Sequence, residues 1–371
     1  MRVSIDILRQ AVKSVLPLAG ESYKGKGTGG FVVLENSMWL VSGSFGHRFA
    51  GARVSDEIDE DLIDKWFIIT DLSLFLGATH TSEYVDVTFN KDKNTIFVKC
   101  GRPYKNMPYI STADITKSID LPPLSSGMQM YDMAILKTVA SASHTSFDNR
   151  LHGVYMVGGS DIEILCTDGF LVAYTKIKNE LSYNFTILVP ADFLSYVGRT
   201  YWNTYPRMHV VDKKLYFVSD DFFAIGNTLN DEQYPGKPIL EFYSNIEFGN
   251  EASIDALDLS DKLTALTGID QRFDRDFIDV SAIKFQFDDD RGDLFLSAQS
   301  KERGDSGFYL SSSGLTYECV LNGHLAKKAT SLLRDVNTNN LLFSPADGQN
   351  LMLVRPSDSD NLIVGIVPMS H

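Results

Sequence analysis

Cysteine is scarce in this chain, with three residues among 371. Cys100, Cys166 and Cys319 lie far apart in strand-like segments, so they match neither a disulfide framework nor the paired spacing of a zinc site. The seven histidines also lack metal-ligand spacing. We therefore expect buried, reduced thiols in a cytoplasmic protein that holds no metal and no cofactor.

Long apolar runs are also absent. No segment reaches the roughly 20 apolar residues that span a bilayer, and residues 1–4 have the pattern of a strand rather than of a signal peptide. Apolar residues still make up 44% of the chain, which is enough to build packed cores. Because 371 residues exceed what one core usually holds, we expect two or three domains and no membrane partner.

Positive charge is in short supply, since 34 Lys and Arg face 48 Asp and Glu, a net charge of −14. This balance argues against a nucleic-acid partner, but cations recur on corresponding predicted helices and in one Gly-rich loop. These basic positions are Arg9, Lys13, Lys24, Lys26, Lys137, Arg199, Lys327, Lys328 and Arg334. Acidic residues concentrate elsewhere, at 56–64, 288–290 and 358–360. Two interpretations stay open: solvated helix faces, or a repeated basic surface.

Motifs for nucleotide binding and nucleophilic catalysis are missing. Gly20 to Lys26 nearly matches a phosphate-binding Gly-rich loop, but Gly27 stands where a Ser or Thr would hold magnesium. The segment also follows a predicted helix and precedes a strand, the reverse of the order that such a loop needs. No Gly-x-Ser-x-Gly elbow occurs. We interpret residues 20–27 as a flexible basic loop.

Two acidic motifs have the composition of turns. Asp288 to Asp290, followed by Arg291-Gly292, predicts a hairpin turn rather than a cation site. Thr167-Asp168-Gly169 predicts a turn between two strands, because Asp168 has no catalytic partner in the motif. We expect no enzyme, and the alternative is a metal-dependent hydrolase that uses Asp168 and the acidic clusters. Phe170 and Leu171 at this turn belong either to the core or to a docking surface.

The chain repeats one pattern three times: a strand, a polar cap, a short helix and then a hairpin. Asp71, Asp192 and Gly323 mark the matching caps, and the period is too long for a solenoid repeat. Val85, Val87 and Phe89 alternate with polar residues, which predicts a half-buried antiparallel sheet. The copies span 67–80 with 85–100, 187–200 with 208–219, and 318–335 with 341–356.

A further helix opens each copy, at 6–19, 131–144 and 259–270, and Asp6 and Ser260 are candidate N-caps. Each third of the chain is therefore helix, strands, helix, strands. Turn-rich joints at 121–127 and 244–253 divide the chain into three domains of one design. The predicted domains are 1–121, 122–247 and 248–371.

The middle third carries a resemblance. Leu151-His152-Gly153-Val154, Thr167-Asp168-Gly169, Val172-Ala173 and Val189-Pro190 closely resemble the second domain of the bacterial-type DNA polymerase sliding clamp, the β subunit. Tyr234-Pro235 and the apolar C-terminal segment 366–369 are similar to that family too. Members usually carry His-Arg after Thr-Asp-Gly and end in Arg-Leu, where this chain has Phe170-Leu171 and Ser370-His371. These departures resemble a phage or mobile-element version.

The resemblance implies an α+β fold of three tandem clamp domains in a head-to-tail homodimer. The antiparallel sheets would form the outside of the ring, and two helices per domain would line a hole that encircles duplex DNA without sequence specificity. The basic positions would face DNA, and partners would be a DNA polymerase and a clamp loader. A rival of the same fold is a clamp-like regulator that competes for host replisome partners. From the family's contact of third against first domain we expect dimer anchors at Tyr104, Met107, Leu266 and Ile269.

The resemblance also implies a cleft between the second and third domains that binds extended peptides of replication proteins. An apolar groove with an adaptable methionine suits several partners in turn. The matching positions are Leu151, Thr167, Gly169, Phe170, Leu171, Val172, Val367, Pro368 and Met369.

Overall fold

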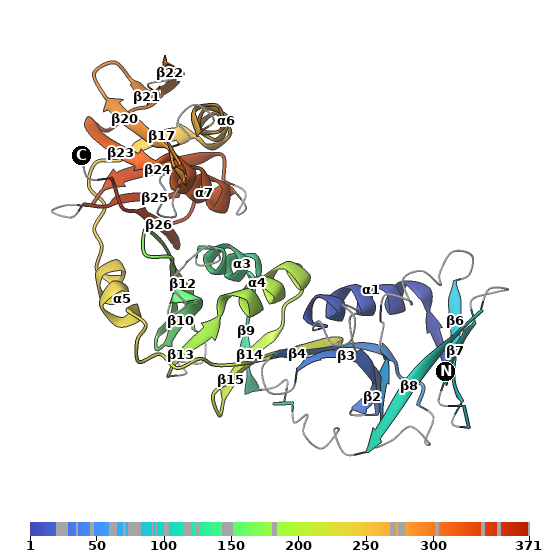
Figure 1. Cartoon of the computed structure of the whole chain (residues 1–371). Coiled ribbons are helices and arrows are strands. Elements are labelled where there is room, and N and C mark those ends of the chain that lie inside the picture. Colours follow the sequence, from blue (N-terminus) through green and yellow to red (C-terminus); the bar gives the residue numbers. More distant parts are fainter. Residues whose placement is uncertain are drawn as a thin grey trace. The chain divides into compact units, whose positions relative to one another are not determined.

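A computed structural model of the chain describes residues 1–19, 29–34, 36–44, 48–58, 65–69, 72, 83–90, 92–93, 95–99, 104–113, 121–123, 126–142, 151–179, 184–267, 272–273, 279–300, 304–334, 338–346 and 350–369 (Figure 1). The chain falls into two compact units. Unit 1 comprises Met1–Tyr131 and Asn203–Thr228, and unit 2 comprises Asp132–Trp202 and Leu229–His371.

A twelve-stranded sheet runs through unit 1, and all of its neighbouring strands pair antiparallel. Strands β4 and β16 pair, so the sheet joins strands from the first and the middle third of the chain. Its order is β1 (Arg2–Ser4), β6 (Tyr84–Asn90), β7 (Thr95–Lys99), β8 (Tyr104–Ala113), β5 (Lys65–Ile69), β2 (Gly29–Leu34), β3 (Ser37–Ser44), β4 (Arg48–Ser55), β16 (Phe222–Asn227), β15 (Lys214–Val218), β14 (Arg207–Val211) and β9 (Met128–Gln129).

The predicted alternation in this sheet is confirmed. Val85 and Val87 of β6 are fully buried, whereas Asp86 and Thr88 between them are exposed. Helix α1 (Ile5–Val15) covers strands β3 and β4, and its buried face joins the same core (Figure 1). Apolar residues at helical spacing on α1 therefore meet the alternating apolar face of the sheet.

Unit 2 contains an eight-stranded antiparallel sheet in which β12 pairs with β26, so the middle and the last third share one sheet. Its order is β13 (Phe185–Pro190), β10 (Gly153–Gly158), β11 (Asp161–Thr167), β12 (Leu171–Lys178), β26 (Leu362–Ile366), β25 (Met352–Pro356), β24 (Asn340–Pro345) and β17 (Ala252–Asp255). A second sheet has the order β22 (Gly304–Ser311), β21 (Asp293–Ser300), β20 (Ala282–Asp288) and β23 (Tyr317–Asn322), and β18 (Arg272–Phe273) pairs with β19 (Asp279–Val280).

Two helix pairs accompany these sheets: α3 (Ala134–Ala140) packs on α4 (Ala191–Thr200), and α6 (Ala256–Thr267) packs on α7 (Gly323–Arg334). The first pair is very close at Gly198 of α4, where an added Cβ would lie 2.7 Å from the backbone nitrogen of Lys137 and 2.7 Å from the carbonyl oxygen of Met133. The predicted helices at 131–144 and 259–270 are thus confirmed in place, with shifted ends.

Four predicted helix caps are wrong, and a fifth, Asp71, lies outside the described residues. Asp192 lies in the first turn of α4, which begins after Pro190, and Gly323 is the first residue of α7, which is capped by Asn322.

The other two wrong caps were predicted for α1 and α6. Helix α1 begins at Ile5 after Ser4, so Asp6 lies in the first turn, where its charge favours the helix dipole. Helix α6 begins at Ala256, and the carboxylate of Asp255 accepts a 2.7 Å hydrogen bond from the amide of Asp258. Ser260 is therefore inside the helix. The helix begins one turn earlier than predicted because Asp255, at the end of β17, supplies a favourable N-cap side chain there.

The acidic turn at 288–292 is confirmed as a hairpin turn between β20 and β21. The carboxylate of Asp288 accepts a 3.2 Å hydrogen bond from the amide of Arg291, and Gly292 has φ +68°, which favours glycine. Cys166 and Cys319 are buried thiols that are not joined in a disulfide, and burial raises the pKa of Cys319 to about 12. Cys100 lies outside the described residues. In the described part of the chain, no helix is both long and apolar enough to cross a membrane.

Helix α5 (Gly236–Ser244) was not predicted. It follows Tyr234-Pro235, and its apolar residues Leu240 and Tyr243 pack against the eight-stranded sheet.

The two compact units divide the predicted middle domain 122–247, because β14, β15 and β16 continue the sheet of unit 1. The three domain boundaries therefore stay predictions.

Candidate functional site

The turn between β11 and β12 is built by the Thr-Asp-Gly motif. The hydroxyl of Thr167 donates to the carbonyl oxygen of Leu171 and accepts from the amide of Gly169, both at 3.0 Å. The Oδ1 atom of Asp168 accepts from the amides of Phe170 (3.0 Å) and Leu171 (2.8 Å). Gly169 has φ +96°, a conformation that a larger residue adopts only with strain. Each residue of the motif thus has a structural task in the turn.

The two apolar residues after the motif face different environments. Leu171 is fully buried, whereas 51% of Phe170 is exposed. The core interpretation therefore holds for Leu171 and not for Phe170. Phe170 is therefore available for contact with another molecule, and apolar surface shared by several neighbouring residues is typical of a contact site.

The C-terminal segment adjoins this turn. The amide of Val367 donates a 3.0 Å hydrogen bond to the carbonyl oxygen of Phe170, which extends the pairing of β12 with β26 by one step. Val367 is 36% exposed, and Pro368 after it is buried. The amide of Met369 donates to the carbonyl oxygen of Val320 on β23, at 2.9 Å. The structure therefore brings Val367 to the turn and directs Met369 to the neighbouring sheet.

Leu151 and Val172 lie at the margin of one apolar cluster. Both are half-buried, and a Cβ on Gly169 would lie 3.6 Å from Leu151 Cδ1. The half-buried Ile239 and Phe242 of α5 pack against the same cluster, and sequence reasoning missed them. Helical spacing of Ile239, Leu240 and Tyr243 was the available signal. The buried members are Tyr155, Leu165, Tyr174, Leu188, Tyr234, Leu240, Tyr243, Ala346, Leu353 and Ile363.

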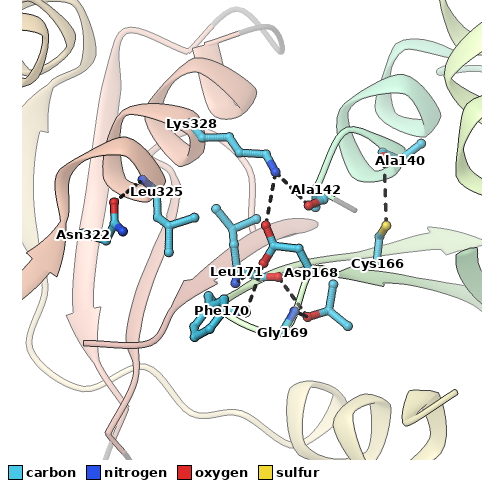
Figure 2. A network of polar contacts seen from close by, with 11 residues as sticks. Ala140, Ala142, Cys166, Asp168, Gly169, Phe170, Leu171, Asn322, Leu325 and Lys328 are labelled. Atoms are coloured by element: carbon cyan, nitrogen blue, oxygen red, sulfur yellow. Dashed lines mark hydrogen bonds and ion pairs between the residues drawn. The ribbon is translucent and has the colours of Figure 1, made fainter. Parts of the chain in front are cut away.

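An ion pair joins the turn to helix α7 (Figure 2). The ammonium of Lys328 lies 3.3 Å from Oδ2 of Asp168 and donates a 2.8 Å hydrogen bond to the carbonyl oxygen of Ala142, just after α3. The Asp168 side chain is 6% exposed and that of Lys328 is 22% exposed. Helix α7 is itself capped by Asn322, whose side-chain oxygen accepts from the amides of His324 and Leu325. Lys328 was predicted to face DNA, and this contact argues against that role.

The other predicted basic positions fall on helices wherever they are described. Lys13 of α1, Arg199 of α4 and Arg334 of α7 are exposed, and Lys137 and Lys327 are partly exposed. Arg9 is also partly exposed and lies 3.6 Å from Asp6 in an ion pair. Lys24 and Lys26 lie outside the described residues. A role of these side chains at DNA stays a prediction.

Sequence comparison alone identifies no relative, because no protein-family profile and no curated protein matches the chain. Structural comparison finds proteins of similar fold. The chain is similar to the DNA polymerase III β subunit of Thermotoga maritima, with TM-score 0.77, 13% identity, and coverage of 100% of this chain and 99% of that one. It is also similar to the β subunit of Pseudomonas aeruginosa (TM-score 0.78, 13%, 100% and 100%) and the sliding clamp of Bacillus subtilis (TM-score 0.76, 13%, 100% and 98%).

The chain has the sliding-clamp fold. The likeness extends over its whole length, so the predicted resemblance is confirmed at the level of the fold. Within the described residues, no three His, Cys, Asp or Glu side chains gather in a group that could hold a metal ion. The hydrolase alternative therefore gains no support from this part of the chain.

The four predicted dimer anchors need one correction. Leu266 is fully buried within unit 2, so its side chain is not available to a second chain. Its helical position on α6 was compatible with either face, and the side chain packs inward. Tyr104 and Met107 belong to β8, whose side chains here are not described, and Ile269 lies outside the described residues. Leu257 of α6 (56% exposed) and Tyr309 of β22 (64%) are large apolar residues that do reach the surface of the unit.

Proposed function

We propose that this chain is a processivity clamp that encircles duplex DNA and tethers a DNA polymerase, without catalysing a reaction itself. The observation that carries this proposal is the structural likeness to DNA polymerase III β subunits over the full length of the chain. A fold alone does not fix a function. The proposal therefore also rests on a basic set of helical residues in an acidic protein and on an exposed aromatic residue at a turn.

Ring closure would come from two chains arranged head to tail. A heterologous contact whose rotation closes makes a ring instead of a fibre. Strand β22 ends the four-stranded sheet in the described part of unit 2, and its pairing partner is β21. Its Tyr309 is exposed and packs on Phe295 with ring centroids 4.6 Å apart. We infer that this edge, rather than Leu266, supplies anchors to the first domain of the partner.

DNA would be held by topology with weak phosphate attraction. A net charge of −14 repels DNA from most of the surface, while Lys13, Lys137, Arg199, Lys327 and Arg334 would present cations along the hole. Such contacts position DNA without reading its bases, so the ring can slide. The exposed positions of three of these side chains are compatible with that task.

Partner proteins would dock at the turn of residues 167–171. Exposed Phe170 and half-exposed Val367 offer apolar contacts, and Leu151 and Val172 continue toward the apolar cluster. An extended peptide with large apolar side chains matches this chemistry. A polymerase and a clamp loader, which use the site in turn, are the partners that the proposal implies.

The mass of the protein in solution tests whether two chains associate, as a ring requires. Sedimentation equilibrium at micromolar concentration should give twice the mass of one chain. A strict monomer over that range would remove the ring on which encirclement depends.

A further inference from the structure

One carboxylate serves two structural purposes at the proposed docking turn. Oδ1 of Asp168 accepts the amides of Phe170 and Leu171, while Oδ2 meets the ammonium of Lys328 at 3.3 Å. Lys328 comes from α7, 160 positions away in the sequence. Figure 2 shows its side chain reaching out from α7, with its terminal nitrogen in contact with both Asp168 and Ala142. Lys328 thus joins three segments of unit 2.

Burial increases the energetic importance of the ion pair between Asp168 and Lys328. Asp168 is 6% exposed and Lys328 is 22% exposed, so the pair is shielded from water far more than an ordinary surface ion pair. Hydrogen bonds with an ionised partner are stronger than neutral ones. Loss of one member would leave a buried charge without its counter-charge, which is costly. The ammonium therefore holds the carboxylate of Asp168 in one orientation.

The orientation of Asp168 determines that of Phe170. With Oδ2 held by Lys328, Oδ1 faces the two amides that close the turn. The carbonyl oxygen of Phe170 in turn accepts the amide of Val367. The backbone of Phe170 is thereby fixed on both sides, and its side chain stays 51% exposed. Preorganised anchors of this kind bind with less loss of entropy.

We propose that Lys328 is a positioning residue of the partner-binding surface: it acts through Asp168 to hold Phe170 ready for a partner. This inference rests on the proposed function, and it replaces the expected role of Lys328 at DNA. Lys328 does not itself touch the partner. Its side chain reaches from α7 to the turn. One ion pair, Lys328 with Asp168, therefore connects the helix that was predicted to face DNA with the docking turn.

Hydrogen exchange tests the positioning role without any partner. In Lys328→Met, the amides of residues 169–171 should exchange about tenfold faster, because a charge-assisted bond that anchors the turn is removed. Lys328→Arg should restore most of the protection, since it keeps a cation on a stem of similar length. Lys178→Met is the matched control: it removes one exposed cation from the far end of the same hairpin and should exchange like the wild type.

A binding titration then tests the consequence. The probe is a fluorescently labelled polymerase C-terminal peptide. Lys328→Met should bind it about tenfold more weakly, and Lys178→Met should bind it like the wild type. The same titration in an Asp168→Asn background tests whether Lys328 acts through Asp168. Once the carboxylate is gone, loss of Lys328 should reduce the peptide affinity little further.

The outcomes separate the two claims. Unchanged exchange at 169–171 in Lys328→Met would overturn the positioning role, and so would faster exchange spread through the whole chain, which indicates a general loss of structure. An equal loss of peptide affinity from Lys328→Met in both backgrounds would also overturn it. If the turn loosens as expected but the wild type binds no peptide, the positioning role stands and the proposed docking function fails.

Discussion

The amide of Val367 donates a 3.0 Å hydrogen bond to the carbonyl oxygen of Phe170, although the two residues lie in different thirds of the chain. The bond continues the antiparallel pairing of β12 with β26 up to the docking turn. The turn is therefore supported from its own hairpin, from the C-terminal segment and, through Lys328, from α7. An exposed aromatic residue on such a rigid support is suited to recognition more than to core packing.

Phe170→Ala should weaken binding of a polymerase C-terminal peptide by about 2 kcal/mol, roughly thirtyfold, because an exposed aromatic anchor typically dominates a small interface. The melting temperature should stay the same, since Phe170 is 51% exposed and contributes little to the core. A fluorescence titration and a thermal melt measure the two effects. Val211→Ala, at an exposed apolar residue of unit 1, is the control. Equal peptide affinity of Phe170→Ala and the wild type would contradict the proposed docking site.

Tyr309→Asp should convert the dimer to monomers. A carboxylate at an exposed position of an edge strand would lie unpaired against the partner's surface, at a cost of about 2 kcal/mol or more. Sedimentation velocity over a range of concentrations measures the change. Tyr131→Asp replaces an equally exposed tyrosine of unit 1 and should leave the dimer intact. A dimer of unchanged stability in Tyr309→Asp would exclude β22 as the closing edge.

The salt dependence of DNA binding should report the basic helices. Replacing Lys13, Lys327 and Arg334 with alanine should flatten the log–log slope for linear duplex DNA by about 0.9 for each phosphate that is no longer neutralised. Alanine at Lys93, Lys178 and Lys237 removes the same charge from exposed positions off these helices and should leave the slope nearly unchanged. Equal slopes for the two triple variants would mean that the helices do not face DNA.

Gly198→Ala should destabilise the fold by about 1–3 kcal/mol, because the added methyl group would overlap backbone atoms of the α3 segment and force the two helices apart. The free energy of unfolding from urea titration measures the cost. Gly249→Ala is the control, since a Cβ there would meet no atom within 4 Å. A variant at Gly198 as stable as wild type would contradict the close packing of α3 on α4.

Much of the fold follows from local pattern. Alternation of Val85 and Val87 with polar residues fixes a strand and its buried face, and the hairpin turn at 288–292 follows from its Asp and Gly residues. Helix α5 was missed because Pro238 and a short length weaken the local signal that the spacing of its apolar residues gives. Its stability comes from packing of Leu240 and Tyr243 against the apolar cluster, which is a tertiary effect.

The candidate site divides in the same way. The Thr-Asp-Gly turn is local chemistry and could be predicted, whereas the opposite exposure of Phe170 and Leu171 depends on the register of β12. Lys328 was placed at DNA because a lysine on a helix face is indistinguishable in sequence from its neighbour Lys327. Its contact with Asp168 joins residues 160 positions apart, so only the tertiary fold reveals it.

Retention on circular DNA tests encirclement most directly. The protein is loaded onto a nicked circular plasmid with clamp loader and ATP, and the complex is passed over a gel-filtration column at high salt, where phosphate contacts alone do not last. We predict that the protein elutes with the circle and is released when a restriction enzyme cuts the plasmid. Failure to be retained on the circle, or retention that survives linearisation, would contradict the account.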